Sequence, residues 1–131
     1  GGSNPHFSLI APQVSVVTGV ESSDIVASVS ERVKPDLTIL IDTLSTSRYE
    51  RLGRCYQLGN FALTPGSGVG NSKFMRTQGK TLSVGVPLVI KLGDLGVEKL
   101  RNFVVTPADI DEQVARCGKN IARAINAAFG K

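Results

Sequence analysis

The sequence DLTILID, residues 36–42, constrains the fold more than any other stretch of the chain. It is a short and nearly continuous apolar run, as is typical of a strand that is covered on both faces in a parallel sheet. A helix is predicted directly before it in SSDIVASVSERVKP, residues 22–35, whose isoleucine and valines share one face. Ser22 or Ser23 is the expected N-cap, and Pro35 ends the helix.

Further elements are predicted along the chain. VSVVTGV, residues 14–20, favours a short strand that runs into a turn. TLSTSRYERL, residues 43–52, favours a turn or a helix, and CYQLGNFAL, residues 55–63, another short strand. KTLSVGVPLVI, residues 80–90, is rich in valine and predicts a further strand. GDLG, residues 93–96, predicts a turn.

The clearest helix signal lies in TPADIDEQVARCGKNIARAINAAF, residues 106–129. Thr106 is the expected N-cap and Pro107 the first helical position. Apolar residues then recur at steps of three or four and predict a long amphipathic helix with one stripe on the sheet: Ile110, Val114, Cys117, Ile121, Ile125 and Ala128. The alternation of helices and strands predicts a layered α/β domain with a mostly parallel sheet flanked by helices.

Composition and length suit one globular domain. The chain has 131 residues, of which 41% are hydrophobic and 20% charged, so residues 1–131 are expected to form a single domain. Gly1, Gly2 and Ser3 are interpreted as a cleavage scar. Apolar runs stay far below the roughly 20 residues that a membrane-spanning helix needs, so we expect a cytoplasmic protein without membrane contact.

The charge distribution argues against a nucleic-acid-binding protein, and the few cysteines and histidines argue against a zinc site. The net charge of +4 comes from scattered basic residues, which does not indicate a nucleic-acid partner. Cys55 and Cys117 lack CxxC spacing and are expected to be two buried, reduced thiols. Together with His6, the only histidine, they make a poor ligand set for zinc, and no metal or cofactor is expected.

Asp42 and a glycine-rich stretch are the candidate site. Asp42 ends the first predicted strand, where ligands and chemistry collect in open α/β sheets; an Asx cap for the following segment is the alternative. TPGSGVGNSK, residues 64–73, is rich in glycine and small residues, so its backbone can come into contact with a phosphate, a peptide or a neighbouring strand. It matches neither the dinucleotide fingerprint nor the P-loop. Structural glycines for a tight crossing are the default interpretation.

The stretch KPDLTILIDTLSTSRYERLGRCYQLGNFALTPGSGVGN, residues 34–71, resembles the germination proteases of spore-forming bacteria. In that family a strand ending in Ile-Asp precedes a loop that reads Pro-Gly-Ser-Gly-Val-Gly-Asn. APQVSVVTGVESSDIV upstream, and VGVPLVI and FVVTPADIDEQVARCGKNIARAINAAF downstream, are similar to family segments in the same order. The likeness runs from about Ala11 to Phe129.

The resemblance implies a fold like that of hydrogenase-maturation endopeptidases and an atypical aspartic-type endopeptidase that degrades small acid-soluble spore proteins in the spore interior. Asp42 matches one of two aspartates that are thought to do the acid–base work. The other aspartate lies upstream of the matched region. The second carboxylate is therefore expected from an absent segment, from another chain, or from Glu21.

The resemblance also assigns substrate contacts and an assembly. Loop amides are expected to face a substrate carbonyl or oxyanion, and the predicted substrate-binding residues are Pro65, Gly66, Ser67, Gly68, Gly70, Asn71 and Arg48. A solvated surface is the alternative for Arg48. Thr64 stands where the family has histidine, which argues against a metal. Family members form oligomers, and an oligomer is expected here.

Two other hypotheses stay open. The chain can be a catalytically inactive relative that keeps a peptide-binding loop and works as a binding or regulatory subunit. It can also be an unrelated α/β domain that binds a nucleotide or another small molecule. Cleavage of a peptide that depends on Asp42 separates the peptidase hypothesis from both.

Overall fold

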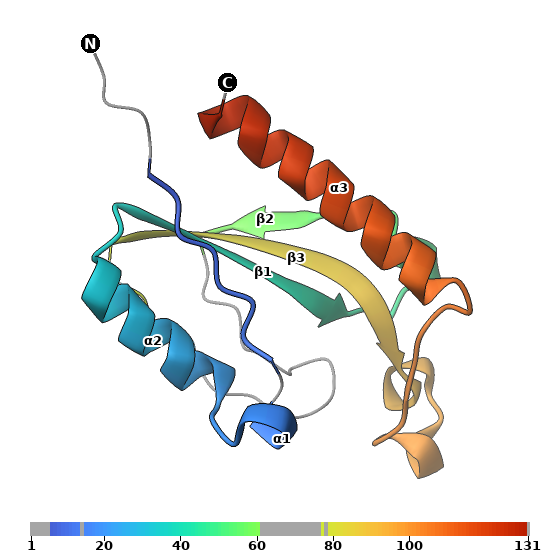
Figure 1. Ribbon diagram of the computed structural model, residues 1–131. Coiled ribbons are helices and arrows are strands. Elements are labelled where there is room, and N and C mark those ends of the chain that lie inside the picture. The colour runs from blue at the N-terminus through green and yellow to red at the C-terminus, as the bar shows by residue number, and fades with distance from the viewer. Residues whose placement is uncertain (1–5, 14, 61–76, 78, 131) are drawn as a thin grey trace.

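The computed structural model describes residues 6–13, 15–60, 77 and 79–130 (Figure 1). In chain order its helices and strands are α1 (Ser15–Thr18), α2 (Ser22–Val33), β1 (Leu37–Ser45), β2 (Gln57–Gly59), β3 (Lys80–Lys91), β4 (Val104–Val105) and α3 (Ile110–Phe129). Short 3₁₀ turns occupy Tyr49–Arg51, Leu92–Leu95 and Glu98–Leu100. The predicted α/β class is confirmed for the described part of the chain.

The sheet of the described residues is mixed, so the prediction of a mostly parallel sheet is wrong. Its order is β1-β3-β2, and β4 also pairs with β3. β1 and β3 run parallel, with Asp42 opposite Gly85, whereas β2 and β4 are both antiparallel to β3. β2 has only three residues and lies on the far side of β3 from β1. Because it is antiparallel to β3, it needs no crossover of the kind that a parallel neighbour needs.

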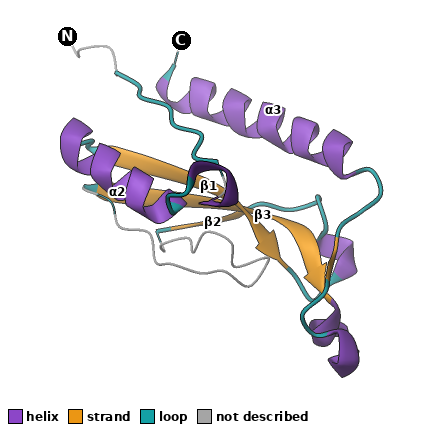
Figure 2. Cartoon of the chain, turned by 60° about the horizontal axis from the view of Figure 1, so that its bottom comes forward, coloured by secondary structure: helices purple, strands orange, loops and turns teal. Residues whose placement is uncertain are grey.

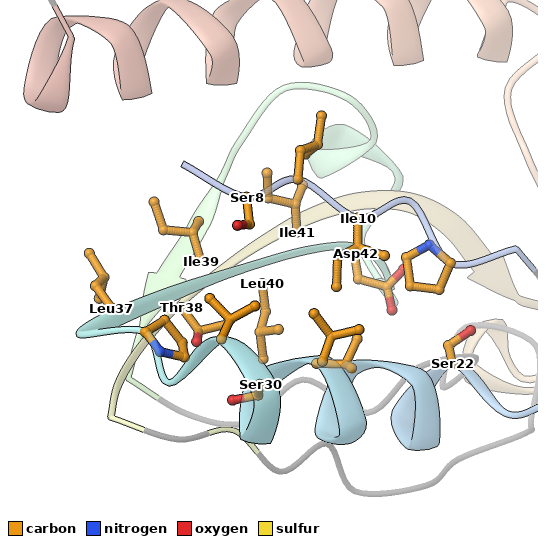
Figure 3. A pocket seen from close by; sticks show the side chains of 16 residues that line it. Ser8, Ile10, Ser22, Ser30, Leu37, Thr38, Ile39, Leu40, Ile41 and Asp42 are labelled. Carbon is orange, nitrogen blue, oxygen red and sulfur yellow. The ribbon is translucent and has the colours of Figure 1, made fainter. Parts of the chain in front are cut away.

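β3 is the centre of the molecule. Its residues Ser83–Ile90 are all buried, whereas β1 is largely half-exposed. Val86 and Leu88 of β3 pack with Cys117 of α3 to form the described core. α3 lies along one face of the sheet (Figure 2), and α2 lies on the opposite side of β1 from α3 (Figure 3). The layers are therefore helix, sheet and helix.

Gly85 of β3 shows how closely the sheet is packed beside Asp42. A Cβ atom on this glycine would lie 2.7 Å from Leu44 Cγ, inside van der Waals contact. Leu44 of β1 thus fills the space that a side chain at position 85 would take. A larger residue at position 85 would require the Leu44 side chain to move, so glycine fits here because of the close approach and not because of its backbone angles.

Three local predictions at element ends are wrong. Residues 15–18 form the short helix α1, not a strand. Glu21 is the N-cap of α2, and the Ser22 hydroxyl donates instead to the carbonyl of Gln13 at 3.3 Å. α3 begins at Ile110 with Asp109 as N-cap, because the chain up to Val105 is still paired with β3.

Two predictions of buried side chains, one for Cys55 and one for Val114, are wrong. Cys55 and Cys117 are both free, as predicted, but only Cys117 is buried. Val114, assigned to the packed stripe of α3, is 49% exposed. Within the described residues, no helix combines the length and the apolar character needed to cross a membrane.

Candidate functional site

A groove runs along β1, between this strand, α2 and the N-terminal segment 8–12 (Figure 3). We call it the β1 groove. Its volume is about 290 Å³, and every residue from Leu37 to Asp42 lines it. The other walls are three valines and two serines of α2, Pro35, and one serine and three apolar residues of the N-terminal segment. Among the described residues, Asp42 is the only acidic one in the lining.

The groove follows from how α2 meets β1. α2 ends at Val33, its C-cap Lys34 adopts a left-handed conformation with φ of 52°, and Pro35 prevents the helix from continuing. The chain then reverses into β1, so α2 runs beside this strand. The hydrogen bond from Ser22 to Gln13 joins the start of α2 to the N-terminal segment, and Figure 3 shows Ser22 and Asp42 at the same end of the groove.

Asp42 is a half-buried carboxylate with one backbone partner. Asp42 was predicted to end the strand, but this prediction is wrong because β1 continues to Ser45. Its Oδ1 atom accepts a hydrogen bond from the Thr43 N–H at 2.8 Å. Burial raises the pKa of the Asp42 carboxyl above its ordinary value of 3.8, and the Thr43 hydrogen bond opposes this rise. A carboxyl group that holds its proton more tightly is a better proton acceptor once it is ionised.

The structure does not bring Glu21 into contact with Asp42. Glu21 precedes α2, and its carbonyl accepts hydrogen bonds from Asp24 and Ile25. Its side chain is not part of the lining of the β1 groove, although the next residue, Ser22, is. The pKa of Asp42 is shifted by burial and by its own backbone partner, and a carboxylate pair is not observed among the described residues.

Arg48 points to a different partner. Its Nε lies 3.2 Å from Glu50 Oε1, and the two side chains are 60% and 48% exposed. A hydrogen bond from the Glu50 backbone and then the one from Arg48 lower the pKa of the Glu50 carboxyl. Residues 43–52 form the end of β1 and a 3₁₀ turn rather than a regular helix. Arg48 has no contact with Asp42 in the described part of the chain.

The predicted loop contacts lie outside the described residues. Pro65, Gly66, Ser67, Gly68, Gly70 and Asn71 all belong to residues 61–76. Their role in peptide binding stays a prediction from the sequence.

Two parts of the lining were not predicted from the sequence. Thr38 stands four residues before Asp42, so both face α2. Its Oγ1 is buried and has no hydrogen-bond partner in the part of the chain that the structure describes. The period of two along a strand could have identified Thr38. Ser8, Leu9, Ile10 and Pro12 form a wall, and no periodic pattern in the sequence marks them.

A second cavity has a different chemistry. It lies between the C-terminal half of α3 and the sheet, has a volume of about 340 Å³, and is lined by apolar side chains with Tyr56 and Asn120. The Tyr56 hydroxyl accepts a hydrogen bond from Asn120 at 3.0 Å. None of the described residues that line this cavity is acidic or basic, so proton transfer is better served by the β1 groove. The described residues contain no group of three His, Cys, Asp or Glu suited to a metal ion.

Comparison with known proteins identifies relatives. A family model described as germination protease matches residues 3–100. The germination protease of Clostridium tetani is 34% identical over 122 residues, which cover 87% of this chain and 38% of that protein. The germination protease of Caldanaerobacter subterraneus is 41% identical over 113 residues, covering 83% of this chain and 34% of that protein.

A third relative extends the same pattern. The germination protease of Clostridium perfringens is 44% identical over 84 residues, covering 64% of this chain and 25% of that protein. The chain thus spans 38%, 34% and 25% of the length of these three relatives. The match confirms the resemblance drawn from the Ile-Asp strand and the glycine loop. By the family match and by these identities, the chain belongs to the germination protease family.

Proposed function

We propose that the chain is an atypical aspartic-type endopeptidase that degrades small acid-soluble spore proteins. Family membership supports peptide hydrolysis as the reaction. The observation that carries the proposal is the position of Asp42: a half-buried carboxylate with a raised pKa at one end of a groove of about 290 Å³. A perturbed carboxylate in a groove is a physical marker of a catalytic site.

The proposed reaction assigns a proton transfer to each of two carboxyl groups. The ionised Asp42 carboxylate takes a proton from water while the water oxygen bonds to the scissile carbonyl carbon. A second carboxylic acid gives its proton to the amine nitrogen as the C–N bond breaks. Glu21 is proposed for this second role because it adjoins Ser22 at the same end of the groove. Amides of residues 65–71 are proposed to face the oxyanion.

A cleavage assay tests the proposal. We expect the chain to cut a purified small acid-soluble spore protein, and Asp42→Asn to lower kcat/KM by about 10²–10⁴-fold, the usual contribution of a general base. Ser45→Ala, at the end of the same strand, is the matched control and should leave kcat/KM unchanged. Turnover by Asp42→Asn at the wild-type rate would refute the assignment of Asp42.

A second function is favoured by one observation, namely that no other carboxylate contacts Asp42 in the described part of the chain. The chain would then be an inactive relative that binds peptides or regulates another protein. Binding of the spore protein without cleavage, in both wild type and Asp42→Asn, would identify this function.

The proposal also includes the fold family, the substrates, the cellular location and the oligomeric state, all of which rest on the family resemblance. We propose a fold like that of hydrogenase-maturation endopeptidases, with the proteins of the spore interior as substrates and a cytoplasmic location. An oligomer is proposed. A second chain, or a further segment of a longer chain, is the alternative to Glu21 as the source of the second carboxylate. Arg48 is proposed to contact substrate after it leaves Glu50, an exposed pair that costs little to separate.

A further inference from the structure

The connection from β1 to β2 begins with a loop, residues 46–53, that is tied to β3 at both ends. The Thr46 N–H donates a hydrogen bond to the Val89 carbonyl at 2.8 Å. At the other end, the Gly53 N–H donates to the Pro87 carbonyl, also at 2.8 Å. Both acceptors belong to the buried part of β3, which pairs with β1. The two ends of the 46–53 loop are therefore fixed relative to the strand pair that carries the site.

Thr46 also fixes the backbone at Arg48. Its Oγ1 atom accepts a hydrogen bond from the Arg48 N–H at 3.1 Å. A threonine hydroxyl that bonds a backbone group two residues further on is a common way to hold a turn. The backbone at Arg48 is extended, with φ of −117° and ψ of 107°. Thr46 thus links Arg48 to β3, because its own N–H bonds β3 and its side chain bonds Arg48.

α3 holds the other end of the loop. The Gly53 carbonyl accepts a hydrogen bond from Arg116 Nη2 at 2.9 Å. Gly53 is buried and has a φ of 63°, and a Cβ atom at this position would lie 2.7 Å from Gln113 Cδ. Glycine fits here because this φ favours it and because the Gln113 side chain would otherwise have to move. Since Gln113 Nε2 donates to Asp109 Oδ1 at 2.9 Å, the surface of α3 that meets Gly53 is itself held in place.

The Arg48 side chain is less constrained than its backbone. Its guanidinium pairs with Glu50 at 3.2 Å, and the two side chains are 60% and 48% exposed, so separating them costs little. The guanidinium only donates hydrogen bonds, and it therefore suits the carbonyl and carboxylate oxygens of a polypeptide. A donor on a fixed backbone loses less conformational freedom on binding than a donor on a mobile loop.

We infer that Thr46 and Arg116 are positioning residues of the proposed peptidase. They hold the 46–53 loop so that the Arg48 guanidinium is ready to meet an acceptor oxygen of the protein substrate, and each acts through Arg48 rather than by touching substrate. This inference rests on the proposed function and adds which residues prepare the substrate contact. The anchoring contacts are all made between described residues, so they do not depend on what adjoins them in a longer chain. Loss of either anchor should weaken substrate binding and leave the chemical step at Asp42 unchanged.

Substrate binding to the Asp42→Asn variant tests the role of Thr46. The probe is a fluorescein-labelled small acid-soluble spore protein, and its Kd is measured by fluorescence anisotropy on this background so that cleavage does not interfere. Thr46→Val removes the acceptor for the Arg48 N–H but keeps the side-chain shape and the N–H that bonds β3. We expect Thr46→Val to raise Kd by about three- to ten-fold, the range of one hydrogen bond, and Thr46→Ser, which keeps the hydroxyl, to restore it. Ser47→Ala removes the hydroxyl of the next, exposed residue and should leave Kd unchanged.

A double-mutant cycle shows whether both anchors act through Arg48. We expect Arg48→Ala to raise Kd by about ten-fold or more, and on this background neither Thr46→Val nor Arg116→Met should raise Kd further. With Arg48 present, Arg116→Met should raise Kd by about three-fold or more. Arg123→Met, at an exposed position of the same helix, is the matched control and should have no effect. Thermal unfolding checks that each variant is folded; if Arg116→Met is unfolded, the cycle with Thr46→Val decides.

The outcomes separate this inference from the proposed function. Equal Kd for Thr46→Val and Thr46→Ser, an effect of Thr46→Val that persists without Arg48, or no binding of the spore protein overturns the inference, even if Asp42→Asn abolishes cleavage. The expected changes in Kd, together with a wild-type chain that does not cut the spore protein, keep the positioning role and refute the peptidase activity. Where the wild-type chain cuts it, Thr46→Val should raise KM and leave kcat unchanged. A fall in kcat alone would place Thr46 in the chemical step and would also overturn the inference.

Discussion

At the scale of single residues, the proposed function rests on Asp42. The sequence predicted its importance because it ends the apolar run of residues 36–42. The structure places it inside β1, in the lining of the β1 groove. What the sequence could not predict is its environment. Burial that raises the pKa and the opposing Thr43 hydrogen bond both depend on how α2 and the N-terminal segment enclose the strand.

The raised pKa of Asp42 makes a prediction about stability. A raised pKa in the folded state means that the fold favours the protonated form, so this contribution is full below the ordinary pKa of 3.8 and is lost as pH rises through the folded value. At pH 7 the ionised group is held in a partly desolvated site. We expect Asp42→Asn to raise Tm at pH 7 and to leave it unchanged near pH 3, measured by thermal unfolding. A lower Tm at pH 7 would contradict the assigned direction.

At the scale of elements, long periodic segments were predictable and their ends were not. The helices and strands now assigned to α2, β1, β2, β3 and α3 were all expected from hydrophobic patterns. The direction of β2 was not, because three residues contain no signal for the strand they will pair with. Thr106 and Pro107 resemble a helix start, but the pairing of Val105 with Ile90 keeps the chain extended there and delays α3 to Ile110.

The contact between β3 and α3 makes a second prediction. Leu88 is 3% exposed in the core, whereas Val114 on α3 is 49% exposed. We expect Leu88→Ala to lower the free energy of unfolding by about 2–5 kcal/mol because it leaves a cavity. Val114→Ala, the matched control, should change it by less than about 0.5 kcal/mol. Urea unfolding measures both, and equal effects would show that the apolar stripe of α3 packs differently from the structure.

At the scale of the whole molecule, the source of the second carboxylate is the main prediction. Ser22 and Asp42 lie at the same end of one groove (Figure 3), so Glu21 and Asp42 are expected to act within one chain. Asp42→Asn and Glu21→Gln should each be inactive, and an equal mixture of the two variants should stay inactive in the cleavage assay. Activity recovered on mixing would show that each site is shared between two copies.

The most direct test of Asp42 as the proton acceptor is the pH dependence of kcat/KM for a small acid-soluble spore protein. Activity should rise with pH as the Asp42 carboxyl ionises, with the midpoint of this acidic limb above 3.8, because burial raises its pKa. A limb at or below that value, or activity that does not change with pH across the acidic range, would contradict the role of Asp42.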